Sequence, residues 1–168
     1  MSSSPTMQLP RSGPSWLTLP LFIIGVMIVG ASGAVFTPGG PNDWYAQLQR
    51  PPLAPPSWIF APVWTTLYVM MATSAWLIWE ARREQAVRWP LTLFAMQLLC
   101  NAAWSPLFFG AQQPLLALID LVAMWALIVA TIVSFARISR WAALLLVPYL
   151  AWVSFAGYLN AGFWWLNR

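Results

Sequence analysis

The chain has 168 residues, of which 60% are hydrophobic and only 7% are charged. Soluble domains carry about 25% charged residues, so this composition excludes a water-soluble fold and indicates a chain embedded in a lipid bilayer. The net charge of +4 comes from arginines near predicted helix ends, which indicates membrane topology and argues against nucleic-acid binding.

The chain has no His and a single cysteine, Cys100. An intramolecular disulfide is therefore impossible, and neither a protein-ligated metal nor an obligatory cofactor is expected. Cys100 lies in an apolar stretch, so it is interpreted as a small buried hydrophobe rather than a reactive thiol.

The first apolar run covers 16–36 and follows a Ser- and Pro-rich segment, 1–15, which we predict to be a disordered tail. A run of about 20 apolar residues is enough to span a bilayer. The run also resembles a cleaved signal peptide, because Arg11 precedes it and small residues stand near its end. We predict a retained helix, because the later spans need it to pack against, and one membrane domain over 16–168.

Residues 37–56 form a loop, because their prolines and glycines exclude a long helix. A short helix is expected within 43–49. A connection of this length is usually either a functional lid or a disordered segment. The aromatic residues Trp44 and Tyr45 favour a lid over the bundle.

Four more apolar runs follow, with tryptophans at several of their ends, as is typical of the membrane interface. They are 57–79, 89–109, 114–136 and 141–166. The sequence therefore predicts an all-α fold, an integral membrane bundle of five transmembrane helices. Most arginines fall on the amino-terminal side, so the amino terminus is expected on the cytoplasmic side if the protein lies in an inner membrane.

Polar and aromatic side chains gather in the outer half of the predicted bundle, beneath the loop. They are Trp64, Tyr68, Gln97, Asn101, Trp104, Asp120, Trp152 and Asn160, and Ala156 shares the helix face of the last two. Polar groups within spans usually face the bundle interior, so the set predicts a cavity for a flat, mostly apolar ligand with some polar edges. Packing and interhelical hydrogen bonds alone also explain these residues. Asp120 is either a charge near the interface or a carboxylate that faces the cavity.

Small residues recur four positions apart in the first and fourth spans. They are Gly30 with Ala34, and Ala126 with Ala130 and Ser134. Such spacing puts small side chains on one helix face and predicts close helix packing, within one chain or between two.

Several ordered motifs resemble those of one known family. They are Trp44, Tyr45 and Arg50 with the following prolines in the loop, 60–68 in the second span, Gln97, Asn101 and Trp104 in the third, Asp120 and Trp125 in the fourth, and Pro148, Tyr149, Trp152 and Asn160 in the fifth. Over about 30–168 the chain is similar to the TspO/translocator proteins, also called peripheral-type benzodiazepine receptors or tryptophan-rich sensory proteins.

The resemblance implies a five-helix bundle, often a homodimer in the bilayer, whose outer-half pocket binds porphyrins and synthetic isoquinoline or benzodiazepine-type ligands. The pocket residues that it implies are Gly33, Tyr45, Trp64, Tyr68, Asn101, Trp104, Leu121, Trp152 and Ala156. A sterol-binding pattern associated with animal members fails here, because the first basic residue after Tyr158 is Arg168. That departure favours a tetrapyrrole ligand over a sterol.

The sequence therefore predicts a membrane receptor or sensor that binds a porphyrin, either protoporphyrin IX or haem. A bound haem would lack its usual axial ligand, because the chain has no His. One alternative is light-dependent porphyrin breakdown, in which Trp64 and Trp152 form radicals. No conventional catalytic constellation supports ordinary enzyme chemistry. Another alternative is transport of tetrapyrrole or sterol-like molecules, for which the intramembrane charge of Asp120 offers thin support.

Overall fold

The computed structural model describes residues 16–36 and 44–168, and it is helical with no strand over these residues. Its helices are α1 (Leu19–Ala34), α2 (Trp44–Gln47), α3 (Phe60–Glu80), α4 (Arg88–Ser105), α5 (Pro114–Ala136) and α6 (Arg140–Leu166). A 3-10 turn, Ser57–Ile59, leads into α3, and a wider π-helical turn, Pro106–Gly110, extends α4. The predicted all-α class is confirmed.

Four of these helices, α3 to α6, are long and apolar enough to cross a membrane. The exception among the five bundle helices is α1, with 16 residues against a predicted span of 16–36. At about 1.5 Å per residue it measures about 24 Å, less than the hydrocarbon core of about 30 Å. The helix α2 is shorter than the expected 43–49, and the predicted tail 1–15 and loop residues 37–43 lie outside the described residues.

The residues at the starts of α5 and α6 explain why these helices begin there. Pro114 is the first residue of α5, a position where its missing N–H costs no hydrogen bond. Ser139 precedes α6, and its hydroxyl oxygen accepts a hydrogen bond from the Ala142 backbone N–H at 3.3 Å. The turn before α5 places Gln112 at a φ of 55°, in the left-handed region.

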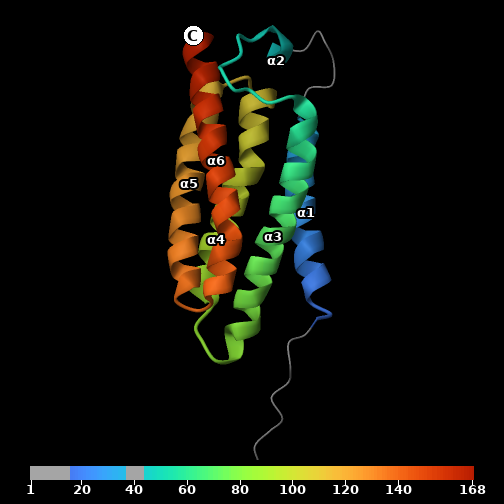
Figure 1. The fold of residues 1–168 in the computed structure, drawn as a ribbon, viewed down its shortest axis with the longest axis vertical. Helices are drawn as coiled ribbons and strands as arrows, with labels where there is room; N and C mark the ends of the chain where they lie inside the picture. The colour runs from blue at the N-terminus through green and yellow to red at the C-terminus, as the bar shows by residue number, and fades with distance from the viewer. Residues whose placement is uncertain (1–15, 37–43) are drawn as a thin grey trace, which may run out of the picture.

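The five bundle helices, α1 and α3 to α6, run alongside one another (Figure 1), and their contacts close into a ring. In that ring α1 packs on α3, α3 on α6, α6 on α5, α5 on α4, and α4 on α1. The helix α2, the α4–α5 connection and the carboxyl end lie at one end of the bundle, called the loop end here. The α3–α4 and α5–α6 connections lie at the other, called the arginine end.

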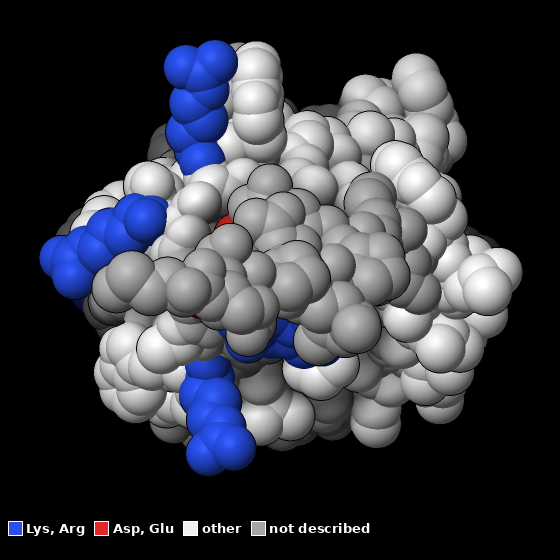
Figure 2. Space-filling view, turned by 90° about the horizontal axis from the view of Figure 1, so that it is seen from below, with Lys and Arg blue, Asp and Glu red and all other residues white. Residues whose placement is uncertain are grey.

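The arginine end carries Arg82, Arg83, Arg88, Arg137 and Arg140. Several arginine side chains project from this face in Figure 2. Two of them lie over the indole rings of neighbouring tryptophans, at 4.4 Å from the Trp79 ring centroid and 4.9 Å from that of Trp141. Tryptophan and arginine side by side are typical of the membrane interface.

The small residues have two different roles. Gly30 brings α1 against α3, because a Cβ atom there would collide with the Tyr68 ring. Its close packing is therefore within one chain. On α5, Ala126 is exposed, whereas Ala130 and Ser134 are half-buried. That row of small side chains remains open to a contact between chains.

Candidate functional site

A chain of hydrogen bonds crosses the middle of the bundle, from α3 through α4 to α6. The Tyr68 hydroxyl donates to Asn101 Oδ1 at 3.0 Å, and Asn101 Nδ2 donates to the Tyr149 hydroxyl oxygen at 3.2 Å. The Tyr149 hydroxyl in turn donates to Gln97 Oε1 at 2.9 Å. Tyr149 and Gln97 are 0% and 1% exposed. Three helices thus share one network of phenol and amide side chains, which is buried except at Tyr68.

Tryptophan rings border this network. Trp64 stacks on Tyr68 with ring centroids 5.2 Å apart, and it also meets Tyr149 edge-on at 6.2 Å. Trp152, one helix turn above Tyr149 on α6, packs edge-on against Phe60 at 5.8 Å. All but Tyr149 are half-buried, so part of the surface of each of these rings is accessible.

A second polar contact lies nearer the loop end. Trp104 Nε1 donates to Asn160 Oδ1 at 2.9 Å, and Asn160 Nδ2 donates to the Pro114 carbonyl oxygen at 2.8 Å. The Trp104 ring stacks on Phe108 at 5.0 Å. Asn160 therefore orients the indole while it holds the first residue of α5, which ties three helices together.

The loop covers this end through Tyr45. Its ring packs against Phe108, Phe109 and Phe163, with centroid distances of 6.2, 5.3 and 5.3 Å. The Arg50 guanidinium lies 5.6 Å from the Tyr45 ring centroid. Burial raises the pKa of the Tyr45 phenol above its usual value, and the Arg50 charge partly offsets that rise. Tyr45 therefore stays neutral at physiological pH.

Loop residues 49–52 contact α6 and the residue that follows it, Asn167, and we call this set of contacts the α6 clamp. Asn167 forms two hydrogen bonds with the Gln49 backbone: its Oδ1 accepts from the N–H at 2.9 Å, and its Nδ2 donates to the carbonyl at 3.1 Å. The Tyr158 hydroxyl donates to the Pro52 carbonyl oxygen at 3.1 Å. Pro51 fits over Gly162, where a Cβ atom would lie only 2.6 Å from Pro51 Cβ.

Sequence reasoning missed the clamp. A polar residue at a helix end and a glycine near the membrane surface are both common, and neither identifies its partner. The one available signal was the sequence of prolines after Arg50, which needs a flat surface such as Gly162 to pack on closely.

The structure joins some of the predicted pocket residues directly. Tyr68 bonds Asn101 and stacks on Trp64, whereas Tyr45 and Trp104 meet through Phe108. Trp152 and Ala156 pack on the same apolar core as Trp64, Tyr68 and Trp104.

Two predicted pocket residues have other neighbours in the structure. Gly33 is buried against Ser105, whose Oγ would lie 3.0 Å from a Cβ atom there. Leu121 is buried too, but it also lines a groove on the outer surface between α5 and α6.

Two buried polar atoms lack a hydrogen-bond partner among the described residues. They are Gln97 Nε2 and Asp120 Oδ2. The Cys100 thiol lies beside the Asp120 carboxyl group. Asp120 is half-buried with one oxygen, Oδ2, fully buried, so it is not a fully hydrated charge, and its role as a carboxylate that faces the cavity stays a prediction. Gln97 Nε2 is a buried donor at the end of the central network, on a residue that is 1% exposed.

Known proteins match nearly the whole chain. The model of the TspO/MBR family matches residues 22–166. The tryptophan-rich protein TspO of Chlorobaculum tepidum is 48% identical over 145 residues, which cover 86% of this chain and 92% of that protein. The translocator protein of Bos taurus is 43% identical over 159 residues, covering 92% and 93%. The tryptophan-rich sensory protein of Cereibacter sphaeroides is 36% identical over 135 residues, covering 79% and 84%.

Proposed function

Because this chain belongs to the TspO/MBR family and is a multi-pass integral membrane protein, we propose that it is a membrane receptor or sensor for a porphyrin. The ligand would bind in the half of the bundle nearest the loop end. Trp64, Tyr68, Trp104 and Trp152 would stack against it, and Asn101 would meet its polar edge.

One observation carries this proposal: half-buried aromatic rings surround a buried chain of tyrosines and amides. Stacked or edge-on aromatic pairs contribute about 0.5–1.5 kcal/mol each beyond the burial of their area. A porphyrin offers a large aromatic face, with polar groups at its centre and on its rim. We expect the half-buried Tyr68, with its partner Asn101, to meet those polar groups. With no His in the sequence, stacking and hydrogen bonds would hold the ring.

A titration with protoporphyrin IX tests the site. The purified wild-type protein should bind it, as measured by the change in porphyrin absorbance. The double variant Trp64→Phe with Trp152→Phe should bind at least roughly fivefold more weakly, because two smaller rings lose about 1 kcal/mol of stacking. The matched control, Trp89→Phe with Trp141→Phe, changes two exposed rings at the arginine end and should bind as the wild type does. Full affinity in the first double variant would refute the site.

A second candidate function is light-driven breakdown of the bound porphyrin. The stacked pair of Trp64 and Tyr68, 5.2 Å between centroids, places two oxidisable rings together beside the proposed ligand. Illumination of the complex should then bleach the porphyrin absorbance faster than illumination of free porphyrin. Equal bleaching rates with and without protein would leave receptor or sensor as the function.

We also propose that the arginine end faces the cytoplasm. Five arginines lie near the α3–α4 and α5–α6 connections, and α1 begins at the same end (Figure 1). Short loops rich in arginine stay on the cytoplasmic side. A single cysteine introduced at Gln85, in a Cys100→Ala background, should react with a membrane-impermeant maleimide only after the cells are opened. Reaction in intact cells would contradict this orientation and show that the arginine end faces outward.

A homodimer is the proposed assembly. The exposed Ala126, with Ala130 and Ser134 on the same face of α5, offers a row of small side chains for close approach by a second copy. Crosslinking in the bilayer should give a dimer that Ala126→Leu weakens. A wild-type chain that stays monomeric would contradict the assembly, and a dimer indifferent to Ala126→Leu would contradict this interface.

A further inference from the structure

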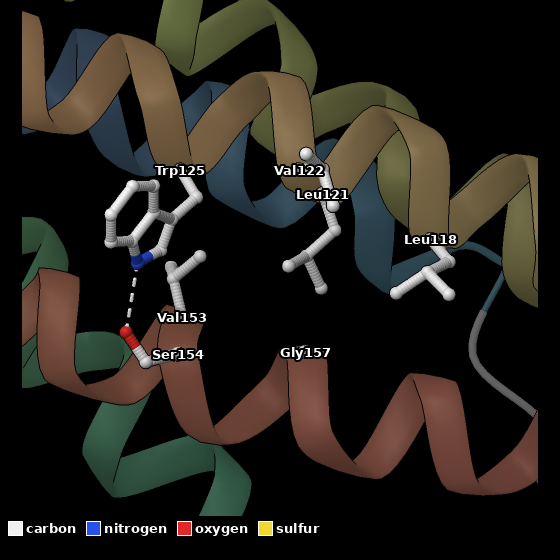
Figure 3. Close-up of a pocket in the computed structure, with 7 residues that line it drawn as sticks. All are labelled: Leu118, Leu121, Val122, Trp125, Val153, Ser154 and Gly157. Atoms are coloured by element: carbon white, nitrogen blue, oxygen red, sulfur yellow. Dashed lines mark hydrogen bonds between the residues drawn. The ribbon is translucent and has the colours of Figure 1, made fainter.

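A groove runs along the outside of the bundle between α5 and α6, away from the central network. Its volume is about 500 Å³, within the about 300–1,000 Å³ typical of small-molecule sites. The lining residues are Leu118, Leu121, Val122, Trp125, Val153, Ser154 and Gly157. Figure 3 shows them facing one another across the two helices, with Gly157 opposite Leu121.

The depth of the groove places it in the hydrocarbon region. Leu118 stands four residues into α5 from Pro114, and Trp125 stands eleven residues in. At about 1.5 Å per residue, the groove extends from about 6 Å to about 16 Å below that end of the helix. The hydrocarbon core is about 30 Å thick, so the groove runs through one leaflet and ends near its midplane.

The lining offers no free polar group. Trp125 Nε1 donates to Ser154 Oγ at 2.9 Å, the bond drawn in Figure 3. Ser154 Oγ in turn donates to the Leu150 carbonyl oxygen at 2.8 Å. The donors of both polar side chains are thus satisfied within the protein. A molecule with polar edges would find no partner here, whereas a saturated hydrocarbon chain would leave none unsatisfied.

Trp125 is in an unusual place for a tryptophan. Its side chain is 42% exposed and lies near the bilayer midplane, whereas membrane tryptophans concentrate at the two interfaces. Because the indole N–H donates a hydrogen bond to Ser154 Oγ, it does not need water as a partner. The indole is therefore held as the inner wall of the groove, where it presents apolar surface to what lies in the bilayer.

We propose that this groove is a binding site for one acyl chain of a bilayer phospholipid. The chain would lie along α5 and α6 with its methyl end near Trp125. The lack of a side chain at Gly157 leaves space for the acyl chain. A Cβ atom there would already lie 3.2 Å from Leu121 Cδ2, and a larger side chain would fill the groove. The site is separate from the proposed porphyrin site, because it opens to the lipid and lacks free hydrogen-bonding groups.

Native mass spectrometry tests the proposal. Wild-type protein is reconstituted in nanodiscs of palmitoyl-oleoyl phosphatidylcholine and then extracted in mild detergent. It should retain one phospholipid per chain, which the Gly157→Leu variant should lose. The matched control is Gly25→Leu on α1, where a Cβ atom would meet nothing within 4 Å. It should retain the lipid as the wild type does.

A second measurement covers the case in which Gly157→Leu fails to fold. Lipids brominated near the chain methyl should quench wild-type tryptophan fluorescence more than they quench Trp125→Phe. Lipids brominated near the glycerol should quench the two proteins alike. The proposal is overturned if the wild type retains no lipid, if Gly157→Leu retains it fully, or if the two bromine positions give the same difference. A lipid-free dimer would show that a second copy covers the groove instead.

Discussion

Replacing Tyr149 by Phe tests the central network most directly. The hydroxyl group of this 0% exposed residue accepts a hydrogen bond from Asn101 Nδ2 and donates one to Gln97 Oε1. Its removal leaves both of those groups buried and unpaired. Since Gln97 Nε2 already lacks a partner, Gln97 would then make no side-chain hydrogen bond to the described residues.

The expected loss can be bounded from two sides. An unsatisfied buried polar group costs about 1–3 kcal/mol, so two would cost about 2–6 kcal/mol. Hydrogen bonds between membrane helices average about 0.6 kcal/mol and reach about 1.7, because the unfolded chain in the membrane also finds partners. The second scale applies to this environment. We therefore expect Tyr149→Phe to lower the free energy of unfolding by about 1–3 kcal/mol.

The assay is equilibrium unfolding in mixed micelles with increasing dodecyl sulfate, followed by circular dichroism. Adding Gln97→Leu to Tyr149→Phe removes one orphaned amide and should recover part of the loss. The coupling energy of this double-mutant cycle should therefore be at least about 0.5 kcal/mol. Additive effects, or a single variant as stable as the wild type, would refute the view that these bonds stabilise the bundle.

Three further predictions concern α1 and the loop. Asn167→Ala removes both side-chain bonds of the α6 clamp to the loop, so stopped-flow mixing should show faster porphyrin binding and faster release. Unchanged rates would mean that the clamp does not control access. Gly30→Ala should destabilise by about 1–3 kcal/mol through overpacking, whereas Gly25→Ala, which points into open space, should not, as thermal unfolding of both variants would show. Burial raises the pKa of Tyr45 in the folded protein above its usual value of 10. The neutral phenol therefore contributes fully to the free energy of unfolding below pH 10, and this contribution is lost as the pH rises through the folded-state pKa. Arg50→Gln should raise that pKa further in an ultraviolet titration, and a lower value would contradict the role of the charge.

Hydrophobic runs and proline positions predicted the bundle well, because a membrane span needs a definite length of apolar residues. The observed α5, Pro114–Ala136, has the bounds expected for the fourth span. The first span came out shorter than expected, since composition does not show where an apolar run stops being helical. The direction of each helix also predicted that Tyr68 and Asn101 lie in the same half of the bundle. In the structure the two side chains form a hydrogen bond.

The contacts between individual side chains could not be predicted from the sequence. Nothing in the chain shows that Asn160 bonds Trp104, or that Gly30 is small because of the Tyr68 ring. Such contacts depend on the rotation of each helix about its axis, and hydropathy alone does not fix rotation when a helix is apolar on all sides. The groove beside Leu121 was missed for the same reason, because the residue was assigned only to the interior.

The ring of helices has a consequence for the order of assembly in the membrane. Contacts of α1 with α3 and α4, and of α4 with α5, join the first four long helices into an open arc. The helix α6 packs on both α3 and α5, so the ring is complete when the last helix is inserted. Until then the amides of Gln97 and Asn101 lack the Tyr149 hydroxyl as a hydrogen-bond partner. A chain that stalls before α6 therefore holds these polar amide groups inside the membrane without that partner, which is costly.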